Sequence, residues 1–312
     1  MTDQLHLPVL EHETVQALNL HENSVVVGAT YGRGGHVRSI ISCLGPEGKL
    51  ILIDRDEQAI AHADENFGQD ERVSIVHASF ADLKRILHNR DLLGKVNAIL
   101  FDFGVSSPQL DQVERGFSFT KDGPLDMRMD QTEGVTAEQW LTEVEEQELA
   151  IVLKKFGEER FAKRIARTIK EFQKENSLDT TGKLADLISE SIPTREIGKH
   201  PATRSFQAIR IAINDELTQI ESVLPDALNA LAPGGRLVVI SFHSLEDRIV
   251  KRYFREQSKG DPFPPDLPVP QSMLAPTLKI VGKAVKPSTE ELQLNPRARS
   301  AVMRAAEKLK VA

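Results

Sequence analysis

Short apolar runs alternate with helix-like stretches over the first hundred residues, and this alternation constrains the fold more than any other feature. Four runs of aliphatic and β-branched residues, each bounded by Gly, Asp or Asn, predict strands at 24–28, 49–54, 73–76 and 98–102. Between the first two, the apolar positions of residues 37–44 follow the i, i+3, i+4, i+7 spacing of a helix face. This pattern predicts right-handed βαβ units, and therefore an α/β fold with a doubly wound, mostly parallel sheet.

The fifth strand signal, Arg236–Ile240, comes only after the turn sequence Pro233-Gly234-Gly235. It follows the fourth strand by about 130 residues, whereas a crossover needs roughly a dozen. Most of this gap has helical periodicity, and the last pattern continues from Phe206 to Ile220 as one helix that returns to the sheet.

We therefore expect two domains: an all-helical insertion at residues 109–211, and a discontinuous α/β domain formed by residues 1–108 and 212–312. Residues 261–276 are rich in proline and predict an extended loop. The tail from Leu278 is expected to supply the last one or two strands.

The composition excludes several classes of protein. At 40% hydrophobic and 27% charged residues, the 312-residue chain is typical of a globular protein rather than a disordered or fibrous one. No apolar run is long enough to span a bilayer, and the N-terminal residues lack the features of a signal peptide, so no membrane partner is expected. Cys43 is the lone cysteine. A single cysteine excludes a disulfide framework and a cysteine-based zinc site, so no metal is expected. This cysteine content favours a reducing cytoplasm.

The charge is distributed unevenly. The net charge is −7, yet residues 151–210 carry 13 Lys and Arg against 8 Asp and Glu, a net of +5. A basic segment in an acidic protein is either a nucleic-acid-binding face or a solvated helix surface, and charge alone does not decide between them.

Polar residues follow every predicted strand. In an open parallel sheet, ligands bind at the carboxyl ends of the strands, so these residues converge on one rim. They are the glycine-rich segment 28–36, then Asp54, then Ser79-Phe80, then the segment 102–109, and finally Ser241-Phe242-His243-Ser244.

The glycine-rich segment does not fit a dinucleotide. The G-x-G-x-x-G motif requires a third glycine where this chain has Val37, and no P-loop motif follows any strand. What remains is a turn that lets the backbone approach an uncharged ligand group, together with Asp54, placed to accept hydrogen bonds from two ribose hydroxyls. S-adenosylmethionine (SAM), a nucleoside without a pyrophosphate, satisfies this pattern better than NAD. The alternative for Asp54 is a helix N-cap before Asp56-Glu57-Gln58.

Several long motifs resemble the RsmH (MraW) family from about His6 to Arg304. They are T-x-G-x-GGH at 30–36, IDRD at 53–56, GVSSPQLD at 104–111, ERGFS at 114–118, GPLDMRM at 123–129, GEERFA at 157–162, HPATR at 200–204, SFHSLEDR at 241–248 and NPRARS at 295–300. The resemblance implies a SAM-dependent methyltransferase fold with a helical insertion. It further implies methylation of the exocyclic N4 of a cytidine in the decoding region of bacterial 16S ribosomal RNA, and the expected partner is this RNA within the small ribosomal subunit.

By the same resemblance, the SAM contacts fall on seven residues: Gly34, Gly35, His36, Asp54, Phe80, Asp102 and Gln109. The chain departs from the family at Gly28, because the family usually has an acid at the end of the first strand. That acid commonly anchors the amino-acid part of the cofactor, so its absence is expected to weaken SAM binding.

The residues also bear on the reaction. Methylation at cytosine C5 needs a cysteine nucleophile, and Cys43 lies on the helix after the glycine turn, where a core role is favoured. Zinc-dependent deamination would need motifs that the chain lacks. Transfer to N4 needs no covalent intermediate, only positioning of the amine. The candidates for positioning the amine lie in the loop from Asp102 to Pro108. Asp102 is either a catalytic residue or only a cofactor ligand. Ser106 and Ser107 either contact the substrate or only shape the turn.

Contacts with RNA are expected mainly in the insertion. Six basic residues form a stripe at spacings of three or four: Arg160, Lys163, Arg164, Arg167, Lys170 and Lys174. We expect this stripe, Arg164 and Arg167 above all, to meet phosphate. His243 is either a substrate contact or a cap of the turn. Four aromatic residues are candidates for stacking on the base, with core packing as the alternative for most: Tyr31, Phe103, Phe117 and Phe119.

Two other functions stay open at this point. One is a SAM methyltransferase that acts on another RNA or on protein. The other is a ribosome-assembly factor that binds RNA and whose SAM site has weakened, which Gly28 would explain.

Overall fold

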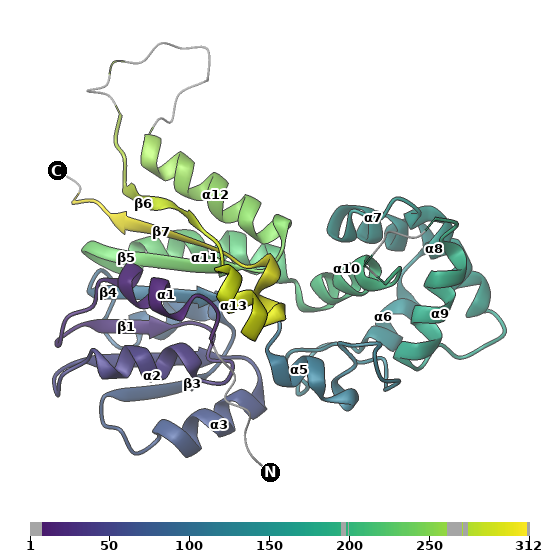
Figure 1. Cartoon of the computed structure of the whole chain (residues 1–312), viewed down its shortest axis with the longest axis horizontal. Helices are drawn as coiled ribbons and strands as arrows, with labels where there is room; N and C mark the ends of the chain where they lie inside the picture. Colours follow the sequence, from purple (N-terminus) through teal and green to yellow (C-terminus); the bar gives the residue numbers. More distant parts are fainter. Residues whose placement is uncertain (1–7, 195–197, 199, 261–269, 271–273, 311–312) are drawn as a thin grey trace. The chain divides into compact units, whose positions relative to one another are not determined.

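The computed structural model describes residues 8–194, 198, 200–260, 270 and 274–310 (Figure 1). The chain divides into two compact units. The first, here called the sheet unit, comprises Met1–Gly104 and Leu217–Ala312, and the second, the helical unit, comprises Val105–Glu216. The expected domain boundaries lay after residues 108 and 211.

The sheet unit is built on seven strands in the order β3-β2-β1-β4-β5-β7-β6. Strands β1 to β5 pair in parallel, and β7 and β6 are antiparallel, so the predicted doubly wound, mostly parallel sheet is confirmed. The strand order reverses between β1 and β4, which is where such sheets bind ligands. The strands are β1 (Val25–Gly28), β2 (Lys49–Asp54), β3 (Val73–His77), β4 (Val96–Asp102), β5 (Leu231–Ser241), β6 (Leu278–Val285) and β7 (Val302–Lys308).

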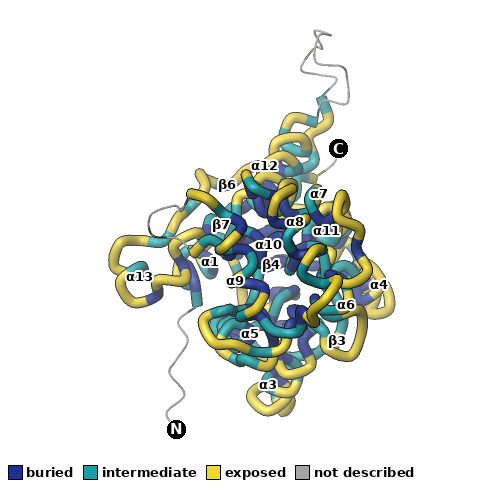
Figure 2. The backbone as a smooth tube through the Cα atoms, turned by 90° about the vertical axis from the view of Figure 1, so that its right-hand side faces the viewer, coloured by how far each residue is buried: buried dark blue, intermediate teal, exposed yellow. Residues whose placement is uncertain are grey.

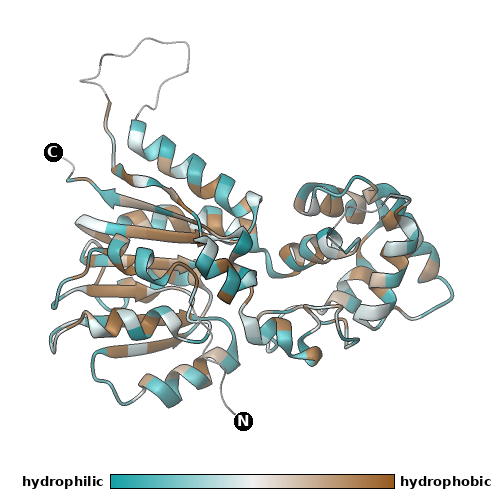
Figure 3. Ribbon diagram, viewed as in Figure 1, coloured by the Kyte–Doolittle hydropathy of each residue, from teal (hydrophilic) through white to brown (hydrophobic). Residues whose placement is uncertain are grey.

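Helices cover both faces of this sheet, which explains why the strands are apolar nearly throughout. Alternate residues of each strand enter two separate cores: Val27, Ile99 and Val239 lie in one, and Val26 and Leu100 in the other. Figure 3 shows the strands as largely hydrophobic. The helices are α1 (Glu11–Leu18), α2 (Gly35–Ser42), α3 (Glu57–Phe67), α4 (Leu83–His88), α11 (Glu216–Ala230), α12 (Ser244–Lys259) and α13 (Thr289–Leu294), with 3-10 turns η1 (Phe80–Asp82) and η4 (Pro296–Ser300).

The start of β5 differs from the prediction. The strand was expected at Arg236 after a Pro-Gly-Gly turn, but it begins at Leu231, which pairs with Val96 of β4. The register then shifts before Ala98 pairs with Arg236, and Gly234 adopts a φ of +82°. The turn residues therefore form an irregularity inside the strand, because glycine tolerates the left-handed backbone that this register shift requires.

The tail adds two strands, as predicted from Leu278 onward. β7 pairs with β5 and β6 pairs with β7, both antiparallel. Most of the expected proline-rich loop, at 261–269 and 271–273, lies outside the described residues.

The helical unit has a core of its own, built from apolar residues of its helices and of the segment around Leu125 and Met127. In Figure 2 the buried positions are dark blue, and in α8 they alternate with exposed ones. The elements are α5 (Ser107–Asp111), η2 (Val113–Arg115), α6 (Ala137–Glu143), α7 (Glu146–Gly157), α8 (Ala162–Phe172), α9 (Thr181–Ser191) and α10 (Thr203–Asn214).

The single helix predicted from Phe206 to Ile220 is wrong. α10 ends at Asn214, Asp215 takes a left-handed φ of +49°, and α11 begins at Glu216. The Asn214 side chain donates to the Met127 carbonyl at 2.8 Å and accepts from the Met129 N–H at 2.8 Å. This tertiary contact favours a helix end here, and Asp is among the few residues that adopt the left-handed backbone at low cost.

No helix among the described residues is both long enough and apolar enough to span a membrane.

Candidate functional site

The first part of the site is the loop between β1 and α2, at the rim where the strand order reverses. Gly34 is the N-cap of α2 and has a φ of +71°. A Cβ atom there would lie 2.8 Å from the Tyr31 hydroxyl, so both the backbone angle and the packing require glycine. At Gly32, which has a φ of +60°, a Cβ would meet no described atom within 4 Å. The loop is therefore closed on the Tyr31 side and open above Gly32.

Asp54, at the end of β2, holds this loop in place. Its Oδ2 accepts the backbone N–H groups of Tyr31 and Gly32, each at 3.0 Å, and its Oδ1 accepts the Asp56 N–H at 2.9 Å. Burial raises the pKa of Asp54, and the backbone hydrogen bonds oppose that rise. The N-cap of the following helix is Asp56, whose side chain accepts the Gln58 N–H, so the capping alternative for Asp54 is wrong.

The acceptor capacity of Asp54 limits what else it can bind. A carboxylate offers about four lone-pair positions. Three of them serve the chain itself. Asp54 therefore has room for one further donor, whereas the sequence suggested two ribose hydroxyls.

Asp102, at the end of β4, is the second carboxylate of the rim. Its backbone N–H donates to Thr30 Oγ1 at 2.8 Å, which ties the ends of β1 and β4 together. The side chain is 28% exposed, but its Oδ1 atom is buried and has no hydrogen-bond partner among the described residues. Burial raises the pKa of Asp102 to about 6; nearby His36 lowers it, and Glu246 raises it. A buried carboxylate oxygen without a donor is costly unless a ligand or substrate pairs with it.

His36 lies beside Asp102. Its Nδ1 is 3.8 Å from Asp102 Oδ2, and its Nε2 is 2.9 Å from the Val9 carbonyl oxygen. Because a carbonyl only accepts, Nε2 carries the proton in this contact, and in the neutral ring Nδ1 offers its lone pair. The imidazole is nearly buried, so it supports the residues at the carboxyl ends of the strands and offers little surface to a ligand.

The aromatic residues divide between core and rim. Phe80, after β3, is half-buried and packs 5.8 Å from Phe101 and 5.5 Å from Phe103, centroid to centroid. It keeps an exposed part at the rim, as expected for a wall against adenine. Tyr31, Phe103 and Phe117 are buried and serve the core, so stacking on a substrate base is excluded for them in this conformation.

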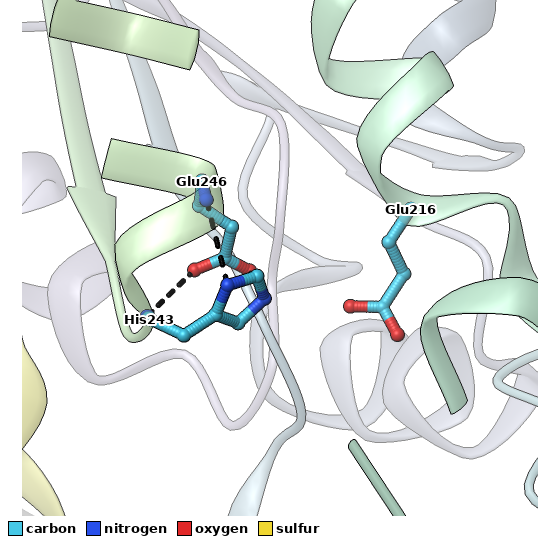
Figure 4. A group of neighbouring side chains, drawn as sticks. All are labelled: Glu216, His243 and Glu246. Carbon is cyan, nitrogen blue, oxygen red and sulfur yellow. Dashed lines mark hydrogen bonds and ion pairs between the residues drawn. The ribbon is translucent and has the colours of Figure 1, made fainter. Parts of the chain in front are cut away.

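The end of β5 carries His243 and Glu246, which Figure 4 shows paired by dashed lines. Glu246 is fully buried and accepts the N–H groups of Phe242 and His243 through Oε2, at 2.7 and 3.1 Å. His243 is the N-cap of α12: its Nδ1 accepts the Glu246 N–H, and its Nε2 lies 3.1 Å from Glu246 Oε1. His243 therefore has the capping role, and Glu246 is a rim carboxylate that sequence reasoning missed. Glu216, also drawn, binds Arg210 at 2.7 Å within the helical unit.

Three of the expected site residues lie at the start of α5, in the helical unit. Ser106 is the N-cap of α5, and its backbone N–H donates to Gln109 Oε1 at 2.9 Å. Gln109 is buried, and Ser107 is half-buried in the first turn of the helix. The side chain of Gln109 thus supports this turn.

The basic stripe lies on α8 and at its ends, and most of it is exposed. Arg164 is exposed, and the Arg167 side chain is 68% exposed, with a loose contact of 3.9 Å to Glu146. Lys170 departs from the prediction: its Nζ donates to the carbonyls of Leu141 and Thr142 at the end of α6, and desolvation lowers its pKa. Lys170 caps a helix and is not available to phosphate.

A second basic helix face was missed, because the charge count covered only residues 151–210. On α12, in the sheet unit, five exposed basic residues fall at helical spacing: Arg248, Lys251, Arg252, Arg255 and Lys259. Counting the charges of each predicted helix separately would have found it.

The chain is similar to known methyltransferases. A model of the MraW methylase family matches residues 3–309. Ribosomal RNA small subunit methyltransferase H of Hydrogenovibrio crunogenus is 52% identical over 304 residues, which cover 97% of this chain and 96% of that protein. Among solved structures, an rRNA methylase from Streptococcus thermophilus matches with a TM-score of 0.45, 11% identity and coverage of 98% and 99% of the two chains. A protein from Streptococcus mutans, described as a methyltransferase and solved in complex with SAH, matches with a TM-score of 0.43, 14% identity and coverage of 97% and 100%.

Proposed function

This chain belongs to the MraW methylase family, and on that premise we propose that it transfers a methyl group from SAM to the exocyclic N4 of a cytidine in the decoding region of 16S rRNA. The family match over nearly the whole chain is the observation that supports both the reaction class and the substrate. The rim of the sheet unit supplies groups that suit both the cofactor and the amine.

The residues present fit SAM. The open space above Gly32 admits a ligand to the backbone, Asp54 can accept one more donor, and the half-exposed Phe80 ring suits a nucleobase. Gly34 and Gly35 form the turn into α2. Two further expected cofactor residues lie in the sheet unit. His36 is nearly buried and supports the loop that would contact SAM, and Asp102 lies beside it at the end of β4. When bound, SAM supplies an electrophilic methyl group.

The chemistry of N4 defines what the protein must do. The lone pair of this amine is delocalised into the cytosine ring, so hydrogen-bond acceptors must orient the amino group, and a base must take the proton that leaves as the N–C bond forms. No covalent enzyme intermediate is needed, which agrees with the position of Cys43 at the C-terminal end of α2, where its thiol contacts the Ser39 carbonyl.

We assign the acceptor role to Asp102. The Asp102 side chain is 28% exposed and its Oδ1 has no donor among the described residues, so the carboxylate keeps acceptor capacity for an N4–H group. A pKa of about 6 makes Asp102 a carboxylate at neutral pH and a stronger base than an ordinary Asp. The same carboxylate then takes the proton from the methylated amine.

The helical unit is proposed to hold the RNA. Arg164 and Arg167 present exposed guanidinium groups on one face of α8, which suits phosphate. Ser106 and Ser107 offer hydroxyl groups at the start of α5, and we keep them as substrate contacts. For His243 a contact with substrate would have to coexist with its capping role. We further propose that the protein binds the rRNA within the small ribosomal subunit and that it acts in the cytoplasm.

A ribosome-assembly factor with a weakened SAM site is the second candidate, and Gly28 favours it. Gly28 is buried at the end of β1, where the resemblance leads one to expect an acid. A factor of this kind would bind subunits without consuming SAM.

The test uses isotopically labelled SAM with small ribosomal subunits from a strain that lacks this gene. After digestion of the RNA to nucleosides, mass spectrometry should find labelled N4-methylcytidine. Label on C5 or on another nucleoside would overturn the proposed atom. Bound protein with no label in RNA would favour the assembly factor.

A further inference from the structure

The helical unit contains a column of rings that runs from its core to its surface. Phe206, on α10, is buried, and the half-buried Phe119 ring packs edge-on against it with centroids 4.7 Å apart. His200 is exposed, and its ring lies 4.5 Å from that of Phe119 at an interplanar angle of 32°. The outermost ring of the column is therefore a solvent-exposed imidazole.

The orientation of this imidazole is fixed by the turn before α10. His200 Nδ1 accepts the Ala202 N–H at 3.2 Å, and the His200 carbonyl accepts the Thr203 N–H at 3.1 Å. In the neutral ring the proton therefore sits on Nε2. A ring that is already held in one orientation loses little side-chain entropy when a ligand covers it.

The structural contacts of the His200 ring in the described part of the chain involve its Nδ1 edge, which accepts the Ala202 N–H, and its packing against Phe119. Phe206 and Phe119 belong to the unit's core, whereas the His200 ring lies outside it and is exposed to solvent. Aromatic and histidine rings of this kind stack on unpaired nucleobases in RNA-binding proteins. Lys121 is exposed two residues after Phe119, and a cation there suits the RNA backbone.

We propose that the exposed face of His200 stacks on an unpaired nucleobase of the substrate rRNA, with Phe119 as the second ring of the stack. The inference rests on the proposed function, since it names a further contact with the same RNA. The base is one other than the target cytidine, whose N4 must meet the carboxylate rim. Because every base has a π-face, the contact holds RNA with little regard for sequence.

Two substitutions of His200 separate stacking from turn formation. His200→Asn keeps a side-chain acceptor for the Ala202 N–H but removes the ring. His200→Phe keeps a ring over Phe119 but removes the acceptor. For methylation of small subunits, His200→Asn should raise KM about tenfold while changing kcat by less than about twofold, as the loss of one base stack predicts. His200→Phe should restore most of that loss. His12→Asn, at an exposed histidine of α1 in the sheet unit, serves as the matched control.

The inference is overturned if His200→Asn keeps the wild-type KM, or if His200→Phe raises KM and His200→Asn does not, because the turn would then be what matters. Thermal unfolding of both variants shows whether the fold is intact. A single-stranded oligoribonucleotide carrying 2-aminopurine gives a readout that is independent of methylation. Wild-type protein should quench its fluorescence and His200→Asn should not, whereas equal quenching by both contradicts the stack. If wild-type protein transfers no methyl group but quenches, the proposed function fails and the stack stands.

Discussion

The two units of this chain present polar groups in different ways. In the sheet unit, Asp54 and Asp102 stand at strand ends. The Asp54 carboxylate accepts the Tyr31 and Gly32 N–H groups, and the Asp102 N–H donates to the Thr30 hydroxyl, so hydrogen bonds fix their surroundings. In the helical unit, the guanidinium groups of α8 extend into solvent, and Arg167 makes only a loose ion pair. A rigid, partly buried rim suits a small ligand that must be oriented within a fraction of an ångström, whereas an exposed basic face suits a long polyanion whose phosphates tolerate imprecise contacts.

This contrast predicts that substitutions at the rim act on the cofactor or on the chemical step, and that substitutions on α8 act on RNA binding and its salt dependence.

The largest effect is expected for Asp102→Asn, which keeps the shape of the side chain but removes the base. We expect kcat to fall by about 10²-fold or more, as for other positioned acid–base groups, with a much smaller change in SAM affinity. In the wild-type enzyme, kcat/KM should fall as the pH drops below about 6, because protonation removes the carboxylate form of Asp102. This fall in kcat/KM at low pH should be absent in Asp102→Asn. A wild-type rate that stays constant between pH 5 and 8 would rule out this role.

Asp54→Ala should weaken SAM binding by about 100-fold, because it removes a ligand group and releases the Tyr31 and Gly32 N–H groups that shape the loop. Asp56→Ala is the matched control. It removes the N-cap of α3 and should lower the free energy of unfolding by about 1 kcal/mol while leaving the Kd for SAM unchanged. Titration calorimetry and chemical denaturation measure the two quantities. Equal losses of affinity in both variants would show that the start of α3, and not the Asp54 carboxylate, is responsible.

Reversing the charges of α8 with Arg164→Glu and Arg167→Glu should raise the KM for subunits about tenfold. The slope of log binding constant against log salt concentration should become shallower by about one to two, according to the phosphates released. The comparison is Lys251→Glu with Arg255→Glu on the exposed basic face of α12, in the sheet unit. If the α12 pair lowers the slope and the α8 pair does not, the RNA-binding face has been assigned to the wrong unit.

The smallest effect is expected for Gly28→Asp, which should tighten SAM binding by a few-fold by supplying an acid at the end of β1. A Cβ atom at this position would lie 3.2 Å from Leu52 Cδ2, a flexible side-chain atom, so the change needs a shift of a few tenths of an ångström. An unchanged or weaker Kd by calorimetry would refute it, and thermal unfolding would show whether strain is the cause.

The rim was predictable from the sequence because a buried parallel strand is apolar on both faces and stops where polar residues begin. The bounds of β2, Lys49–Asp54, are as predicted, and Asp54 follows directly from them. What the sequence could not show is how much of the Asp54 carboxylate the chain itself occupies, since two of its three donors, the Tyr31 and Gly32 N–H groups, lie more than twenty positions away along the chain.

Contacts between distant segments account for the other differences. The helical period continues across Asp215, so it gives no sign of the break, which depends on Asn214 meeting Met127. Lys170 has the same spacing as its basic neighbours, and only its contact with the end of α6 sets it apart. Periodicity specifies which face of a helix is buried, but not which polar residues on the other face find partners.

The central claim, that the cofactor belongs to the sheet unit and the RNA to the helical unit, is tested most directly by one paired measurement. The Kd for SAM and the KM for small subunits would be determined on the same preparations of wild-type protein, Asp54→Ala and the α8 double variant. The account predicts that Asp54→Ala changes mainly the Kd for SAM and that the α8 variant changes only the KM for subunits. A loss of SAM affinity in the α8 variant equal to that in Asp54→Ala would contradict it.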